Sequence, residues 1–330
     1  MNIYLAPMEG VTGYIVRNAI AHNFGRIHKY YTPFIPAAKR LNQKILRDLA
    51  PENNTGISLV PQLMTIQADE VQSMGQCLHQ MGFDEININL GCPSGTVVAK
   101  GRGSGLLRNP DALNAFLSST CDKVDFPVSI KSRIGFEDLS LWPEILSIYA
   151  RYPICELTIH PRLRSDFYNG SVHFDAFDLA YETYVTNKTA LPYPTSLIYN
   201  GDIRTLSDYQ KLRQRYPDIQ GVMIGRGLLH NPALAAQIMA SEHHTTLSET
   251  EIKAGFKALH QEICTQYACI FSGDKDVLFH MNEILSYLHC SFKDSDKIWK
   301  TIRKSQTLAE YEYHVAALFE QPLTLNEIPL

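Results

Sequence analysis

The sequence contains no C-x-x-C cysteine pair and no cysteine–histidine spacing typical of a zinc site. Its seven cysteines stand apart from one another, at positions 77, 92, 121, 155, 264, 269 and 290. Disulfide frameworks and structural zinc sites usually draw on closely spaced sets of cysteine and histidine. We therefore expect no disulfide framework and no metal centre.

Long apolar runs are also absent, and no stretch approaches the roughly 20 residues that a membrane-spanning helix needs. The first residues enter a β-rich run directly, without the basic and apolar regions of a secretion signal. These absences predict a cytoplasmic protein without a membrane segment. The net charge of −4 argues against a surface wholly dedicated to nucleic acid, although it leaves room for a local basic patch.

What the sequence does contain is a regular alternation of β-rich runs and helix-compatible segments. The β-rich runs are residues 3–8, 27–34, 57–63, 85–91, 127–134, 155–160, 195–201 and 221–225. The intervening segments carry helix signals, such as the one-sided apolar pattern of residues 69–82 and the proline that opens the segment after Asn109. Eight alternations predict an α/β fold, a (β/α)8 TIM barrel over residues 1–240. An open doubly wound sheet is the alternative, and the absence of G-x-G-x-x-G after the first run disfavours it.

The pattern changes after residue 240, where strand-like runs disappear. Four helical segments follow, at residues 248–271, 275–290, 294–304 and 308–319. They predict a small all-α helical domain over residues 247–330, joined by a polar linker. Residues 293–304 hold five basic and two acidic side chains. This stretch is either a solvated helix face or a contact to a phosphate backbone, and the sequence leaves both readings open.

Residues 85–108 form the most informative stretch of the chain. Its first half alternates polar and apolar residues, as a strand does, and the strand stops at Gly91-Cys92-Pro93. A glycine-rich segment with only basic charges follows, including Lys100 and Arg102. In a TIM barrel the carboxyl ends of the strands build the active site. Cys92 is therefore a candidate reactive thiol beneath a mobile basic loop, and the alternative is an inert buried thiol.

Polar side chains also follow the other predicted strands. Asn200-Gly201-Asp202 and Gly225-Arg226-Gly227 combine free backbone N–H groups with an arginine, which suits a phosphate. Gln62 can donate to and accept from the edge of a pyrimidine-like ring. Lys131 and His160 can supply charge or hydrogen bonds to an electron-rich ring, although a lone histidine can equally be a satisfied core residue. The combination predicts a site for flavin mononucleotide, FMN.

These motifs resemble those of the tRNA-dihydrouridine synthases. The matching stretches are L-A-P-M-E-G-V (5–11), V-P-Q-L (60–63), I-N-L-G-C-P-S (88–94), G-R-G-S-G-L-L-R-N-P (101–110), V-S-I-K-S-R-I-G (128–135), T-I-H-P-R (158–162), Y-N-G-D-I (199–203) and V-M-I-G-R-G-L-L (222–229). The resemblance implies an FMN-dependent barrel with a helical tRNA-binding domain. It implies reduction of the C5–C6 bond of specific uridines in tRNA, with NADPH or NADH reducing the flavin. We expect such a protein to act as a monomer.

The resemblance also implies a role for each matching residue. Flavin contacts would come from Pro7, Met8, Gln62, Lys131, His160, Asn200, Gly201, Asp202, Gly225 and Arg226, the last five at the ribityl phosphate. RNA contacts would come from Asn89, Arg133 and Arg162 near the uracil and from Lys100 and Arg102 in the loop. Cys92 would donate the proton that C5 of uracil takes up. A thiol with an ordinary pKa of about 8.5 stays protonated at neutral pH, so we expect no strongly activated thiolate.

Other functions compatible with these motifs belong to different classes. An FMN-dependent barrel acting on a small molecule, such as a dihydroorotate dehydrogenase or an ene-reductase, leaves the helical tail without a role. A dihydrouridine synthase acting on rRNA has the same catalytic residues. A protein that binds RNA or a sugar phosphate without flavin would be colourless when purified.

Overall fold

The computed structural model describes residues 1–38 and 40–326, and its ten-stranded sheet contains only parallel pairs. The strands are β1 (Asn2–Leu5), β2 (Lys29–Tyr31), β3 (Ile35–Pro36), β4 (Leu59–Val60), β5 (Gln62–Met64), β6 (Ile86–Leu90), β7 (Val128–Gly135), β8 (Ile154–Leu163), β9 (Ser196–Tyr199) and β10 (Gly221–Ile224). All eight β-rich runs of the sequence thus form strands, as predicted.

The sheet closes on itself through two interrupted strands. β2 pairs with β4 and β3 with β5, so the order β3-β5-β6-β7-β8-β9-β10-β1-β2-β4 begins and ends in the same two chain segments. Pro33 and Pro61 stand at the two interruptions. Proline has no N–H to donate to a neighbouring strand, so strand pairing breaks at these positions. The predicted strand 57–63 is therefore divided into β4 and β5, whereas the predicted strand 27–34 contains β2 and ends just before β3. Joining the halves gives the eight-stranded (β/α)8 barrel that the alternation predicts.

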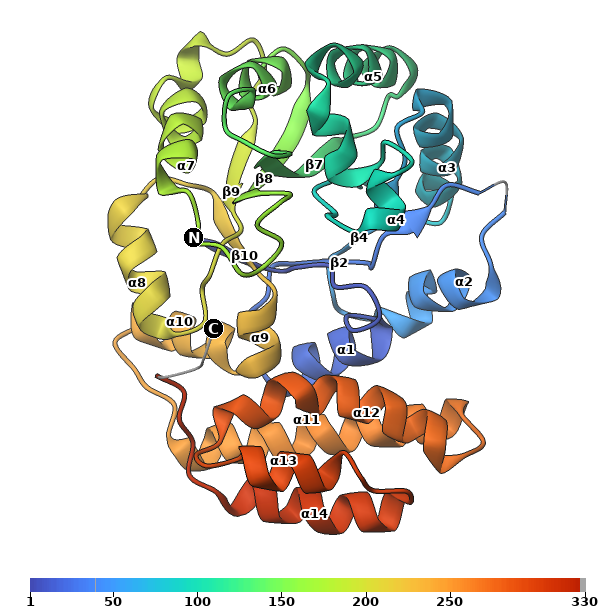
Figure 1. Ribbon diagram of the computed structural model, residues 1–330, viewed down its shortest axis with the longest axis vertical. Coiled ribbons are helices and arrows are strands. Elements are labelled where there is room, and N and C mark those ends of the chain that lie inside the picture. The colour runs from blue at the N-terminus through green and yellow to red at the C-terminus, as the bar shows by residue number, and fades with distance from the viewer. Residues whose placement is uncertain (39, 327–330) are drawn as a thin grey trace.

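Helices cover the outside of the barrel (Figure 1). Asn109 accepts a hydrogen bond from the backbone N–H of Ala112, and Thr205 and Asp208 form a capping box, so local sequence fixes these two helix starts. The helices in this part of the chain are α1 (Tyr14–Asn23), α2 (Gln43–Leu49), α3 (Ala68–Gln80), α4 (Gly95–Val98), α5 (Pro110–Lys123), α6 (Trp142–Tyr149), α7 (Phe174–Tyr181), α8 (Leu206–Arg215), α9 (Arg226–His230) and α10 (Leu234–Glu242).

The predicted helical tail is present as α11 (Glu249–Ile270), α12 (Asp274–Leu288), α13 (Asp296–Ile302) and α14 (Leu308–Glu320), which lie below the barrel in Figure 1. α11 packs against α1 of the barrel. The rings of Phe24 and Phe256 meet edge to face at 5.8 Å, and a Cβ at Gly255 would lie 2.5 Å from the Phe24 ring. Glu262 accepts a hydrogen bond from Asn23 at 2.9 Å. None of the helices in residues 1–38 and 40–326 has the length and apolar character that crossing a membrane requires.

A polar network fills the barrel interior near the amino-terminal ends of the strands. The Lys29 ammonium donates to Glu85 at 2.8 Å and to Glu156 at 3.0 Å, and the Tyr31 hydroxyl donates to Glu156 at 2.5 Å. Burial alone would lower the pKa of Lys29, but the two carboxylates outweigh burial and raise it. The charged network therefore depends on Lys29 to balance two acids.

Lys29→Met is expected to lower the free energy of unfolding by about 3 kcal/mol, because it leaves the Glu156 carboxylate buried without a cation. Urea unfolding followed by circular dichroism measures this change. Lys211→Met, at an exposed position on α8, is the matched control and should leave the midpoint unchanged. Equal stability of the two variants would contradict a structural role for the network.

Candidate active site

A cavity of about 400 Å³ opens at the carboxyl ends of the barrel strands. This volume lies in the range of cofactor and small-ligand pockets. The cavity brings together most of the residues singled out in the sequence: Pro7, Met8, Gln62, Asn89, Cys92, Lys131, Arg133, His160, Asn200, Gly201, Asp202, Gly225 and Arg226. Lys100, Arg102 and Arg162 do not line it. Strand ends that are far apart in the sequence therefore converge on one volume, as the barrel topology requires.

A chain of buried amides crosses one wall of the cavity. Asn87 donates to the Ser129 hydroxyl at 2.9 Å and accepts from Gln62 Nε2 at 2.7 Å. Gln62 Oε1 in turn accepts from Asn89 Nδ2 at 2.7 Å. Each amide in the chain is oriented by the next, so the free N–H and lone pair of Gln62 are held in a fixed direction.

The same chain ends at the turn that carries Cys92. Asn89 Oδ1 accepts hydrogen bonds from the backbone N–H groups of Gly91 at 3.1 Å and Cys92 at 2.9 Å. On the other side of the turn, the Cys92 carbonyl accepts from the Ser104 hydroxyl at 2.8 Å. Burial raises the pKa of Cys92, although Ser94, Arg133 and Lys131 oppose this shift. The thiol therefore faces the cavity in its protonated form at neutral pH.

The glycine-rich segment after Cys92 is folded, where the sequence suggested an open loop. It forms α4 and a 3-10 turn at Gly103–Arg108, and residues 103–107 are buried. Gly103 has φ +56°, and a Cβ there would lie 2.8 Å from the Cys92 carbonyl oxygen, so the glycine serves close packing. Arg102 faces Glu70 at 3.8 Å, and Lys100 is exposed outside the cavity.

Lys131 of β7 also lines the cavity. The hydrogen bonds and ion pairs found within residues 1–38 and 40–326 include none for its Nζ atom. Burial and the neighbouring positive charge of Arg133 lower the pKa of Lys131 to about 7. Because this amine can gain or lose its proton near neutral pH, it can balance the charge of a ligand that becomes negative during a reaction.

His160 at the carboxyl end of β8 is neutral. Burial and the charges of Arg133, Lys131, Arg162 and Arg226 hold its pKa well below the ordinary value. Its Nε2 atom accepts from Arg162 Nη1 at 3.3 Å, which leaves the proton on Nδ1. Of the two roles considered from the sequence, charge or hydrogen bonding, only hydrogen bonding is compatible with this environment.

Three arginines converge on the single carboxylate of Asp202. Arg162 binds it in a two-point contact at 2.6 and 3.1 Å, Arg226 donates at 3.0 Å, and Arg204 lies at 3.6 Å. Burial would raise the pKa of Asp202, but the arginines outweigh it and lower the pKa. The cluster keeps an excess of positive charge at the ends of β9 and β10, where an anionic group of a ligand would be favoured.

Arg133 acts as a clamp between strand ends. Its Nε donates to the Gly91 carbonyl at 3.0 Å, and its two Nη atoms donate to the carbonyls of Leu163 and Phe167 at 2.6 Å each. The guanidinium also lies 5.3 Å from the Tyr168 ring centroid. A side chain that the sequence placed near the substrate thus fixes the turn before Cys92 to the loop after β8.

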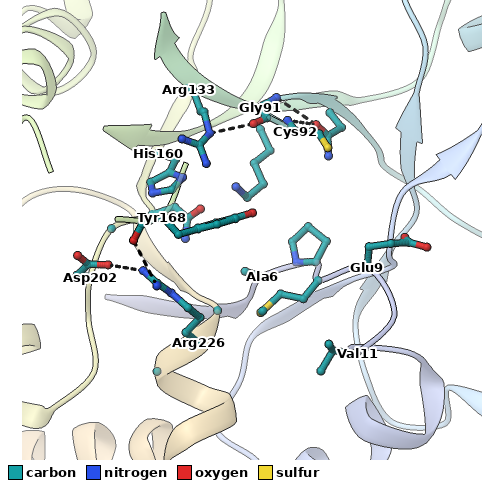
Figure 2. Close-up of a pocket in the computed structure, with 18 of the residues that line it drawn as sticks. Ala6, Glu9, Val11, Gly91, Cys92, Arg133, His160, Tyr168, Asp202 and Arg226 are labelled. Carbon is teal, nitrogen blue, oxygen red and sulfur yellow. Dashed lines mark hydrogen bonds and ion pairs between the residues drawn. The ribbon is translucent and has the colours of Figure 1, made fainter. Parts of the chain in front are cut away.

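Tyr168 is a lining residue that the sequence did not reveal. Its ring enters the cavity between Arg226 on one side and Arg133 and His160 on the other (Figure 2). The centroid distances are 5.4 Å from Arg226, 5.3 Å from Arg133 and 6.2 Å from His160. Tyr168 follows no strand end directly, so strand-end reasoning could not find it. The cations on both sides of the ring hold Tyr168 in place by cation–π contacts at the cavity.

The helical tail also reaches the cavity. Glu283 and Tyr287 of α12 line its rim, and a Cβ at Gly10 would lie 3.1 Å from the Glu283 carboxylate. Nothing in the sequence marks either residue, because the contact arises only when α12 packs across the β1–α1 loop. Within the described residues, no group of three or more His, Cys, Asp or Glu side chains is arranged to hold a metal ion.

Comparison with known proteins agrees with this geometry. The family model described as Dihydrouridine synthase (Dus) matches residues 4–321. A probable tRNA-dihydrouridine synthase of Staphylococcus epidermidis is 27% identical over 312 residues, covering 93% of this chain and 90% of that protein. Probable tRNA-dihydrouridine synthase 2 of Bacillus subtilis is 30% identical over 231 residues, covering 69% of each.

A solved structure of morphinone reductase has the same fold, with a TM-score of 0.50 at 11% identity, covering 76% of this chain and 88% of the other. At 11% identity, this likeness shows the fold alone. The family match extends over nearly the whole described chain and includes the strand ends that build the cavity. The protein therefore belongs to the dihydrouridine synthase family.

Proposed function

We propose that the protein is a cytoplasmic tRNA-dihydrouridine synthase. It uses FMN, reduced by NADPH or NADH, to reduce the C5–C6 bond of specific uridines in tRNA. One observation supports this proposal most directly. The protonated Cys92 thiol shares a cavity with Lys131, which negative charge on a bound ring would keep protonated, and with Arg204 and Arg226 after β9 and β10. A proton donor, a cation for an electron-rich ring and an anion site are the three elements that this reaction needs.

The cavity residues fit the flavin that we propose. Arg226 and Arg204 carry the excess charge that a ribityl phosphate would balance, with Asn200, Gly201, Asp202 and Gly225 beside them. A Cβ at Gly225 would lie 3.3 Å from Ala6 and 3.4 Å from the Met8 sulfur, so glycine leaves space at this strand end. Gln62 would hold the pyrimidine edge, and Lys131 would stabilise negative charge on the ring. When bound, the flavin would supply the hydride for the reduction.

The protein side chains then have separate tasks in the proposed reaction. Cys92 donates its proton to C5 of the uracil, where negative charge builds up, and the raised pKa keeps that proton in place until it is needed. Asn89 holds the backbone of the Cys92 turn through its Oδ1 atom. The base must be splayed out of the tRNA to enter the cavity, which Tyr168 lines beside Arg133. Arg133 connects the Cys92 turn to the loop of Tyr168 through the carbonyls of Gly91 and Phe167.

The direct test is to map dihydrouridine by mass spectrometry in RNA from a strain lacking the protein, and to restore it with the purified protein. We expect specific tRNA positions to lose the modification and to regain it. Loss of dihydrouridine from rRNA alone would show that the substrate is rRNA and not tRNA. A purified protein without flavin absorbance, or one active on free pyrimidines and enones but not on RNA, would overturn the proposal.

Cys92→Ala is expected to keep the bound flavin and its reduction by NADPH but to lose at least 100-fold in dihydrouridine formation, because general acid catalysis contributes on the order of 100-fold or more. Flavin absorbance, anaerobic flavin reduction and dihydrouridine yield measure the three properties in one preparation. Cys290→Ala, at a half-buried cysteine away from the cavity, is the control. Full RNA reduction by the Cys92 variant would refute the acid role.

Alkylation of Cys92 by iodoacetamide should follow a pH profile with its midpoint above the ordinary thiol value of about 8.5. The sign follows from burial, which raises the pKa and so decreases the thiolate fraction at any pH below the midpoint. Peptide mass spectrometry gives the rate at each pH, and the exposed Cys269 in the same sample serves as the reference for general reactivity. A midpoint below pH 7 would show an activated thiolate instead of a stored proton.

Arg226→Ala is expected to weaken FMN binding roughly tenfold or more, because a charge-assisted hydrogen bond to the phosphate contributes about 1.5–3 kcal/mol. Titration of the apoprotein by flavin fluorescence measures the dissociation constant. Arg151→Ala, at an exposed position after α6, is the control. Riboflavin, which lacks the phosphate, should bind the Arg226 variant and the native protein equally. Equal loss for riboflavin would indicate damage to the whole cavity.

A further inference from the structure

An aromatic cluster stands on the surface where α11 meets α12. The His280 ring stacks on Tyr267 at 4.7 Å and on Phe271 at 5.1 Å, with interplanar angles of 14°. The Phe279 ring meets His280 edge to face at 5.3 Å. Phe279 itself is 67% exposed. A large apolar ring held by neighbouring rings and left open to solvent is a feature of binding surfaces.

Phe279 is aligned with the active-site cavity along α12. Phe279, Glu283 and Tyr287 follow one another at intervals of four residues, so they share one face of the helix. Glu283 and Tyr287 line the cavity rim. Phe279 therefore stands about 6 Å farther out along the same face, at the helical rise of 1.5 Å per residue. The exposed ring continues the cavity wall outward.

The short helix α2 brings basic side chains to the same rim. Lys44 and Arg47, three residues apart on α2, are both exposed, and the ion pairs found in residues 1–38 and 40–326 include none for either. Burial raises the pKa of Glu9 and Glu283, and the charge of Lys44 opposes the shift in both. α2 adjoins this side of the barrel mouth, because its Asp48 accepts a hydrogen bond from the Tyr14 backbone N–H at 2.7 Å, just after the β1–α1 loop that carries Glu9. The adjacent Asp48 carboxylate is already bound by Arg17 at 3.1 Å.

We propose that the exposed ring of Phe279 and the basic side chains of α2 bind the RNA nucleotides next to the target uridine, Phe279 by stacking on a base and Lys44 and Arg47 by contacting phosphates. The inference rests on the proposed function, since it concerns the RNA that delivers the uridine. Bases stack on aromatic side chains whatever their sequence, and phosphates seek unpaired cations. The carboxylates of Glu9 and Glu283 repel phosphate, which turns the backbone toward α2 and the bases toward α12.

The chain contains a matched control for the stacking contact. Tyr313 on α14 is 77% exposed, belongs to the same helical tail and does not line the cavity. Comparing Phe279→Ala with Tyr313→Ala distinguishes an RNA contact made at Phe279 from a general effect of removing an exposed aromatic ring. Phe279→Trp keeps a stacking face, and Phe279→Leu keeps only an apolar one. Bound flavin and the unfolding midpoint report whether each variant is folded.

The experiment measures binding of bulk tRNA from a strain lacking the protein to each holoenzyme variant by filter binding at several salt concentrations, followed by turnover. Phe279→Ala should raise the dissociation constant roughly 5- to 100-fold, with Phe279→Trp near the native value and Phe279→Leu close to alanine. The effect should fall on KM for tRNA and leave kcat in place. Lys44→Gln should reduce the slope of log affinity against log salt by about 0.7 to 0.9. Tyr313→Ala should match the native protein.

Three outcomes would overturn the proposal. Phe279→Ala and Tyr313→Ala with the same tRNA affinity would remove the stacking contact. Phe279→Leu binding as tightly as Phe279→Trp would show an apolar contact without stacking. A dimer in solution that Phe279→Ala breaks, with tRNA affinity unchanged, would make the ring a protein interface. Failure of the native protein to form dihydrouridine would instead refute the proposed function, so the two failures are distinguishable.

Discussion

The hydrogen-bonded amide chain from Ser129 through Asn87, Gln62 and Asn89 to the Cys92 backbone is the interaction on which the candidate site depends. It connects side chains of three neighbouring strands, β7, β6 and β5. Because a buried amide without a partner is destabilising by about 1–3 kcal/mol, each member fixes the orientation of the next. The cavity wall and the thiol turn are therefore one rigid unit, and Arg133 attaches the loop of Tyr168 to it.

Charge is distributed unequally around this unit. Arg162 of β8, Arg204 after β9 and Arg226 after β10 surround the Asp202 carboxylate, and Lys131 of β7 lines the same cavity. The opposite rim holds the acids Glu9 and Glu283, whose pKa values are raised by burial. An anionic ligand is thus drawn to one side of the cavity and a neutral flat ring is accepted at the other. A net charge of −4 therefore coexists with a locally positive site for an anionic ligand.

The sequence was most informative where a residue follows a strand directly. Cys92 and the N-G-D and G-R-G motifs were predictable as cavity residues because barrel topology brings all carboxyl strand ends together, and Lys131 lies in the carboxyl half of β7. Arg162 lies near the carboxyl end of β8, but its guanidinium is bound by Asp202, 40 residues away, and by the Gly170 carbonyl, which no local pattern indicates. Tyr168 and Glu283 enter the cavity from a loop and a distant helix. The glycines after Cys92 looked like a flexible loop, because close packing and flexibility both select glycine.

Closure of the barrel has a consequence for the time at which the protein can fold. β1 pairs with β10 from Asn2 opposite Gly221 to Leu5 opposite Ile224. The first strand therefore cannot complete its pairing until the last strand has been synthesised. At synthesis rates of about 5–20 residues per second, roughly 10 to 40 s pass on the ribosome before that partner exists. During this interval the edge of β1 is unpaired and open to wrong strands. Barrel closure is therefore the late, non-local step that nascent-chain chaperones have to protect.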